Sequence, residues 1–132
     1  MVFLDANSVI YLIEQPPTLG SKAKSRVTAL LASGERLAVS DLVRMECQVG
    51  PLKANDLALL AKYVTFFKSP DVSVLPVVPA VCDRAARIRA EYGFKPLDAL
   101  HLAAAVEHGC TRFLSNDAKL KKFPDILVEV LS

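Results

Sequence analysis

Four acidic residues, scattered along the 132-residue chain, are the best candidates for chemistry: Asp5, Glu46, Asp98 and Asp117. Asp5 ends the apolar run 2–4, where a strand buried on both faces is expected. A buried carboxylate without a partner is unfavourable, so a cation or several donors should lie beside it. Oxygen ligands suit the hard cations Mg²⁺ and Mn²⁺, which serve phosphoryl transfer. The acids therefore indicate metal-assisted chemistry on a phosphate ester.

Taken one at a time, the other three acids also have ordinary structural explanations. Asp98 follows Pro96, as in the first turn of many helices, where a carboxylate favours the positive end of the dipole. Glu46 suits a solvated helix face, and Asp117 after Asn116 suits a turn. The spacing alone leaves open whether the four acids meet.

The elements that must position these acids follow from the hydrophobic pattern. The run 1–5 predicts a strand, and 6–14 predicts a helix that ends before a proline pair. The same unit recurs as a strand over 37–40 and a helix over 41–49. The remaining segments predict helices over 18–36, 53–68, 80–93 and 95–109, strands over 72–78, 111–117 and 125–130, and a short helical turn over 118–123.

Strands that alternate with helices predict an α/β fold, a three-layer α/β/α arrangement with a central, mostly parallel sheet. The length of 132 residues suits a single domain over 1–132. Parallel sheets of this kind bind ligands beyond the carboxyl ends of their strands. Asp5 and Asp117 both follow predicted strands, so they have access to that edge.

The overall composition excludes several classes of protein. The net charge of +2 is too small to predict nucleic-acid binding by itself. Three widely spaced cysteines without a CxxC pair suggest neither a disulfide framework nor a zinc site, and they favour a reducing cytoplasm. No signal peptide or membrane-spanning stretch is expected. The high apolar content of 52% favours a protein partner or a dimer.

Four sequence blocks resemble the PIN-domain nucleases, most closely their VapC-type toxin branch: "FLDANSVIYLIE", "SDLVRMEC", "KPLDALHLAAAVEHG" and "FLSNDAKL". The resemblance rests on the order of these blocks and covers essentially the whole chain. It implies a compact α/β/α domain that cuts RNA endonucleolytically with Mg²⁺ or Mn²⁺. It assigns the catalytic and metal-binding roles to Asp5, Glu46, Asp98 and Asp117, and roles in orienting them to Asn7, Ser115 and Asn116.

The resemblance also implies partners, and the chain departs from the family pattern at two positions. The expected partners are an RNA substrate, a second copy of the chain, and an antitoxin segment that covers the acidic groove. Ala6 stands where a Thr or Ser is common, and Lys119 stands where many members carry a further acid. The second departure suggests one tightly held metal ion, with another arriving with the substrate.

Nearby basic and histidine residues have two interpretations each. Four of them flank the acidic blocks and are candidates to hold RNA phosphates on either side of the cut: Arg44, Lys119, Lys121 and Lys122. Ordinary solvated surface explains them equally well. His101, three residues after Asp98, fits a packing or hydrogen-bonding role better than a ligand role.

Two alternatives to a nuclease remain. One is a catalytically silent PIN-like scaffold that binds RNA or forms complexes. The other is an aspartyl-phosphate phosphatase with Asp5 as nucleophile. The latter is disfavoured because Asn7 occupies the place of the second acid that such enzymes use and because no Gly-rich phosphate loop is present.

Overall fold

The computed structural model describes residues 1–131, and its centre is a five-stranded sheet with the order β3-β2-β1-β4-β5. All four strand pairings are parallel, so the expected mostly parallel sheet is parallel throughout. The strands are β1 (Val2–Leu4), β2 (Leu37–Ser40), β3 (Val72–Leu75), β4 (Arg112–Ser115) and β5 (Leu127–Val130). Since all run the same way, their carboxyl ends share one edge.

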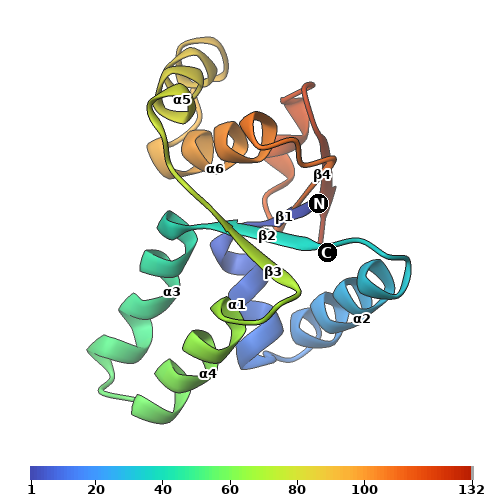
Figure 1. Ribbon diagram of the computed structural model, residues 1–132, viewed down its shortest axis with the longest axis vertical. Helices are drawn as coiled ribbons and strands as arrows, with labels where there is room; N and C mark the ends of the chain where they lie inside the picture. Colours follow the sequence, from blue (N-terminus) through green and yellow to red (C-terminus); the bar gives the residue numbers. More distant parts are fainter. Residues whose placement is uncertain (132) are drawn as a thin grey trace.

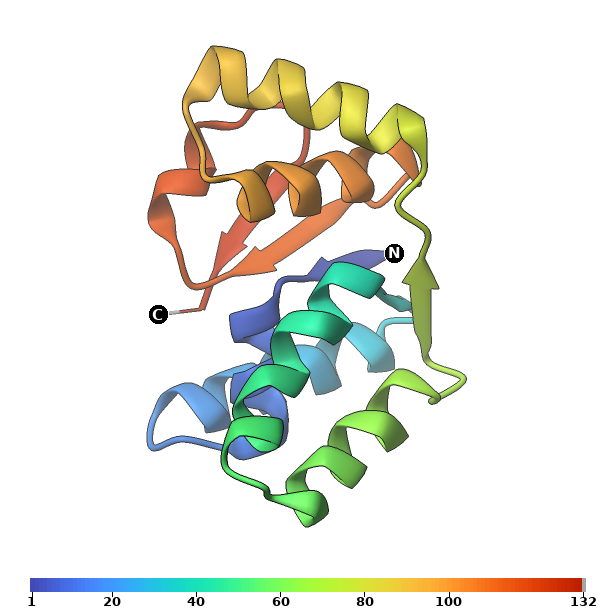
Figure 2. The same cartoon turned by 90° about the vertical axis from the view of Figure 1, so that its left-hand side faces the viewer.

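Helices cover both faces of this sheet, which confirms the three-layer α/β/α arrangement (Figures 1 and 2). One layer holds α1 (Ala6–Glu14), α2 (Leu19–Ala32), α3 (Asp41–Lys53) and α4 (Leu57–Phe67), and the other holds α5 (Pro79–Tyr92) and α6 (Pro96–Glu107). A short 3₁₀ helix, η1 (Ala118–Lys122), follows β4. Over residues 1–131, no helix has both the length and the apolar character needed to cross a membrane.

The hydrophobic core forms around the central strand, because β1 has helices on both faces. Val2, Phe3 and Leu4 are at most 1% exposed, and the Phe3 ring stacks on Phe113 of β4 with centroids 5.3 Å apart. Helix α6 lies under α5, so it is buried nearly all round. In contrast, α4 buries only Tyr63 and Phe67, and its apolar stripe is partly exposed.

Some element ends differ from the predicted ones. Helix α3 continues through Pro51 to Lys53, four residues beyond the expected end, and the buried Pro51 ring packs inward. Strand β3 stops at Leu75 because its partner β2 ends opposite it at Ser40. The next residue, Pro76, has no N–H with which to extend the ladder.

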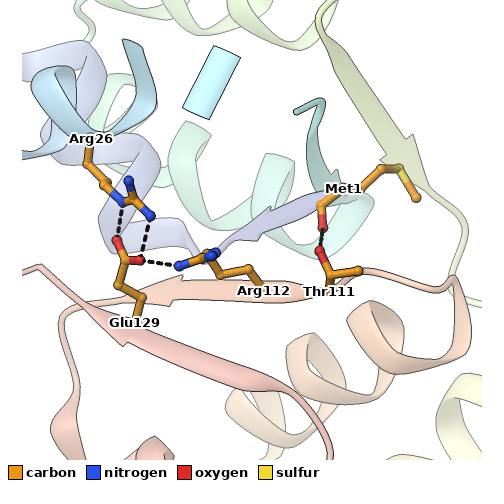
Figure 3. Close-up of polar contacts among 5 residues, drawn as sticks. All are labelled: Met1, Arg26, Thr111, Arg112 and Glu129. Carbon is orange, nitrogen blue, oxygen red and sulfur yellow. Dashed lines mark hydrogen bonds and ion pairs between the residues drawn. The ribbon is translucent and has the colours of Figure 1, made fainter. Parts of the chain in front are cut away.

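Two sets of polar contacts lie along the sheet (Figure 3). Glu129 of β5 accepts hydrogen bonds from Arg26 of α2 and from Arg112 of β4, the latter at 2.7 Å. The Thr111 backbone N–H and hydroxyl both donate to the Met1 carbonyl, at 3.0 and 3.4 Å. These contacts hold α2 against β5 and align the chain start with β4.

Candidate functional site

A cleft of about 700 Å³ opens at the carboxyl edge of the sheet, and all four candidate acids line it. They come from four separate segments: the ends of β1 and β4, the middle of α3 and the first turn of α6. The complete lining is Asp5, Asn7, Glu46, Lys95, Pro96, Leu97, Asp98, Asn116 and Asp117. Acids that are up to 112 residues apart in sequence therefore share one cavity.

Asp5 is the most tightly held acid because it serves both the sheet and α1. Its backbone N–H donates to the Leu114 carbonyl at 3.2 Å, continuing the pairing of β1 with β4. Its carboxylate caps α1 by accepting a hydrogen bond from the Ser8 N–H at 2.9 Å. The residue is only 7% exposed. The carboxylate thus has one side fixed by the helix and faces the cleft.

Asp117 is positioned by the turn that leaves β4. Its N–H donates to the Ser115 hydroxyl at 3.0 Å, and its carboxylate caps η1 by accepting from the Lys119 N–H at 2.9 Å. Ser115 is fully buried, and its hydroxyl also hydrogen-bonds to Asp5. Ser115 therefore contacts two of the four acids.

Glu46 and Asp98 lie on helices that cover opposite faces of the sheet. His101, on the same helix as Asp98, contacts Glu46. The His101 Nε2 lies 2.6 Å from the Glu46 Oε1, and His101 is one helical turn after Asp98. The imidazole is 2% exposed. His101 is thus the hydrogen-bonding histidine expected from the sequence, with Glu46 as its partner.

The electrostatics of the cleft show that the acids repel one another. Burial raises the pKa of Asp5, and hydrogen bonds from Ser115 and Ser8 offset this only in part. Burial also raises the pKa of Asp98, which His101 lowers and the other three acids raise. The carboxylates are therefore close enough to interact, and His101 lowers the pKa of both Asp5 and Asp98.

Two amides extend the site toward α1. The Asn7 side chain donates to the Asn116 Oδ1 at 3.2 Å, and the Asn116 side chain donates to the Tyr11 hydroxyl at 2.6 Å. Both amides line the cleft, and Tyr11 is not among the residues of its lining. This chain of contacts links the turn that carries Asp117 to the helix that Asp5 caps.

The predicted phosphate-binding residues lie outside the lining of the cleft. Arg44 pairs with Asp41 at 2.8 Å and lines a separate hollow beside α4. Lys119, Lys121 and Lys122 are exposed on η1, next to Asp117. The one cationic side chain in the lining is Lys95, which precedes α6.

The donor set fits a hard divalent cation. Asp5, Glu46, Asp98 and Asp117 offer only carboxylate oxygens, and the cleft concentrates negative charge without a balancing Lys or Arg ion pair on these groups among residues 1–131. As the side chains stand in that range, no three His, Cys, Asp or Glu side chains come close enough to enclose an ion. The acids thus share a cleft and do not form a closed cage.

Lys95 and Tyr11 were missed from the sequence, although each has a local signal. Lys95 lies three residues before Asp98 and directly before a proline that starts α6, so it occupies the same helix end as that acid. Tyr11 lies four residues after Asn7, on the same face of α1. Because both signals are common in ordinary helices, these two residues could be linked to the site only from the structure.

Comparisons with known proteins identify the family and the fold. The family model described as PIN domain matches residues 2–126. No curated protein matches the chain. Among solved structures, VapBC2 from Rickettsia felis, bound to a DNA fragment from its promoter, has a TM-score of 0.81 at 19% identity, with full coverage of both chains. A toxin–antitoxin complex from Klebsiella pneumoniae has a TM-score of 0.75 at 22% identity, covering 100% of this chain and 98% of that chain.

A third solved structure is of a toxin described by the loop that it cleaves. Mycobacterium tuberculosis VapC20, described as a Sarcin-Ricin loop cleaving toxin, has a TM-score of 0.69 at 17% identity, covering 86% of this chain and 87% of that chain. At these identities the likeness of the three structures shows the fold.

Proposed function

Because the chain belongs to the PIN-domain family, we propose that it is a metal-dependent endoribonuclease that cleaves RNA phosphodiester bonds. The observation that carries the proposal is the convergence of Asp5, Glu46, Asp98 and Asp117, from four separate segments, on one cleft. Clustered carboxylates destabilise a fold at neutral pH unless a cation offsets their repulsion. A bound divalent cation would offset this repulsion among the four acids.

Asp5, Glu46, Asp98 and Asp117 would hold Mg²⁺, or Mn²⁺ in its place. When bound, such an ion supplies Lewis-acid stabilisation of the charge that develops on the phosphate during hydrolysis. The chain itself provides the fixed framework. Ser8 and Ser115 hold the Asp5 carboxylate in place, and His101 holds that of Glu46. Preorganised donors of this kind spare the site the free energy of rearrangement during the reaction.

The two amides in the cleft have a separate role in this proposal. Asn7 and Asn116 present polar side chains toward the space where a ribose-phosphate backbone would lie. Their mutual hydrogen bond and the bond to Tyr11 limit their rotation. They orient the carboxylate of Asp117 and bind the substrate backbone, which requires no base-specific contact.

We also propose that the protein acts as the toxin of a toxin–antitoxin pair, as a homodimer, with an antitoxin segment over the acidic cleft. Support comes from solved complexes of the same fold, which include a VapBC pair and a toxin–antitoxin complex. Further support comes from large apolar side chains exposed on α3 and α4, which are Met45, Val49, Leu52, Leu57 and Val64. Met45, Val49 and Leu52 recur at helical spacing along α3, and exposed apolar faces are typical of protein interfaces.

Asp5→Asn and Asp98→Asn test the nuclease proposal, with Asp83→Asn as the control. Asp83 is exposed on α5 and lies outside the cleft, so its substitution makes the same charge change elsewhere. Cleavage of labelled RNA in Mg²⁺ or Mn²⁺ should fall by at least about 100-fold in the two cleft variants and be retained in the control. Circular dichroism establishes that each variant is folded.

Two other results would lead elsewhere. Full cleavage by folded Asp5→Asn or Asp98→Asn would refute the nuclease proposal. If the parent chain binds RNA but neither cleaves it nor binds metal by calorimetry, the silent RNA-binding scaffold is the correct function. For the toxin role, expression of the parent chain should arrest growth, and expression of Asp98→Asn should not.

A further inference from the structure

Two cationic side chains contact one residue, Phe94, beside the acidic cleft, and a third cation follows it in the chain. The Arg89 Nε donates to the Phe94 carbonyl at 3.0 Å, and the Lys122 Nζ lies 5.1 Å from the centre of the Phe94 ring. Lys95 follows Phe94 in the chain and lines the cleft itself. Residues from α5, η1 and the start of α6 thus form a cationic rim, defined here as Arg89, Lys95 and Lys122.

The three rim residues differ from several other arginines of residues 1–131 because they form no ion pair with an acidic side chain. Within residues 1–131, none of the three forms a salt bridge. By contrast, Arg26 and Arg112 pair with Glu129, and Arg84 pairs with Glu107. The rim therefore retains its positive charge for an anion from outside the chain.

Packed aromatic residues support two members of the rim, Arg89 and Lys122, through their contacts with Phe94. Phe94 is 6% exposed and stacks on Tyr92 with ring centroids 5.6 Å apart. Tyr92 in turn meets Phe123 edge to face at 5.6 Å. Gly93 ends α5 in the left-handed conformation, with φ of 72°, which sets the direction of the chain into Phe94. A rim on packed aromatic rings loses little conformational entropy when a ligand binds.

The opposite wall of the cleft has a different charge. It is formed by Glu46 of α3, and the nearest arginine in sequence, Arg44, is paired with Asp41 and lines another hollow. Free positive charge beside the cleft is therefore concentrated on the α6 and η1 side. An anionic substrate that approaches four carboxylates is repelled unless cations flank its path.

We propose that single-stranded RNA binds along this one side, with backbone phosphates on Lys95 and Lys122, and not across both walls of the cleft. The inference rests on the proposed function, and it adds the course of the substrate strand. Lys95 contacts a phosphate next to the scissile one because it lines the same cavity as Asp98. Lys122 contacts a phosphate further along the strand.

The test uses the full chain and binding of RNA, not cleavage. A short fluorescein-labelled single-stranded RNA of mixed sequence is titrated in Ca²⁺ at several salt concentrations. Each lost phosphate contact should lower the slope of log affinity against log salt by about 0.7, so Lys95→Gln/Lys122→Gln should lower it by about 1.4. The matched control is Lys62→Gln/Lys68→Gln, which removes two exposed lysines at α4, far from the cleft.

The outcomes separate this inference from the proposed function. Support requires a lower slope and at least about tenfold weaker binding in the rim variant alone, with binding retained in Lys95→Arg/Lys122→Arg. If the rim and control variants weaken equally, or if Arg44→Gln weakens binding as much as Lys95→Gln, the one-sided course is wrong while the nuclease proposal stands. If the parent chain binds no RNA, both are wrong.

Discussion

The imidazole Nε2 of His101 lies 2.6 Å from a carboxylate oxygen of Glu46, and this contact joins α6 to α3 at the candidate site. Each of these helices carries one of the four acids, Asp98 on α6 and Glu46 on α3. The other ring nitrogen of His101, Nδ1, is buried without a hydrogen-bond partner within the described chain. The single contact to Glu46 therefore sets the orientation of both side chains.

Replacing His101 should lower the affinity of the protein for metal while the protein remains folded. Without its partner, the Glu46 carboxylate is free to rotate away from the cleft. We expect His101→Ala to lower the affinity for Mn²⁺ by about 10- to 100-fold, as is typical for groups that orient metal ligands. His101→Gln retains a donor and should lose less. Calorimetric titration measures this, and equal affinity in a folded His101→Ala would contradict the orienting role.

The contribution of Asp5 and Asp98 to the stability of the metal-free protein should fall as pH rises from the acid range. Burial raises the folded-state pKa of Asp5 and Asp98 above the usual value of 3.8, so the folded chain binds these protons more tightly than the unfolded chain. Their contribution is fully present below 3.8 and is lost as pH rises through the folded-state pKa values. Asparagine at either position has no carboxyl group to ionise, so it avoids this loss of stability.

In EDTA at pH 7, Asp5→Asn and Asp98→Asn should therefore have a larger free energy of unfolding than the parent protein. The difference should diminish toward acid pH, where the parent carboxylates are protonated too. Urea unfolding at a series of pH values measures it, with Asp83→Asn as the matched substitution on the surface. A parent protein that is more stable than both variants at pH 7 without metal would contradict the expectation.

Removing the Tyr11 hydroxyl should affect the site, and removing the Tyr63 hydroxyl should not. Tyr11 accepts a hydrogen bond from Asn116 in the cleft, whereas Tyr63 donates to Glu14 away from it. Each Tyr→Phe change should cost about 1 kcal/mol of stability, because each loses one hydrogen bond. Only Tyr11→Phe should slow RNA cleavage. Equal cleavage rates for the two variants would show that Tyr11 has a structural role alone.

The Glu129 carboxylate should stabilise the fold only above acid pH (Figure 3). Hydrogen bonds from Arg26 and Arg112 hold its pKa below the usual value of 4.5. Its contribution is therefore present above 4.5 and is lost as pH falls through the folded-state pKa. Glu129→Gln should lower the free energy of unfolding by about 1 kcal/mol at pH 7 and have less effect in acid. Thermal unfolding at both pH values measures the change, and a constant difference would contradict it.

Several elements could be predicted because their signals are local. The helix over 6–14 and the strand over 37–40 have the predicted bounds, since a proline pair follows the first and a short apolar run marks the second. The ends of α3 and β3 could not be predicted. Helix α3 extends because Pro51 is buried against its neighbours, and β3 is short because β2 ends beside it.

Sequence neighbours were also an unreliable guide to the side chains around the site. Arg44 is two residues from Glu46, which made it a candidate to hold RNA phosphate, with ordinary solvated surface as an equal interpretation. Residues two apart in a helix point in different directions, and Arg44 turns to Asp41 instead. Lys95 lines the cleft because it directly precedes α6, which begins at the edge of the cleft.

The sequence by itself determined the acid types, the alternation of strands and helices, and the place of Asp5 at a strand end, because these depend on composition and short-range periodicity. Only the tertiary structure decided which side chains meet. The contact of His101 with Glu46 spans 55 residues, and that of Asn7 with Asn116 spans 109. Such contacts form when separate helices pack on one sheet, and no local pattern in the chain encodes their distances.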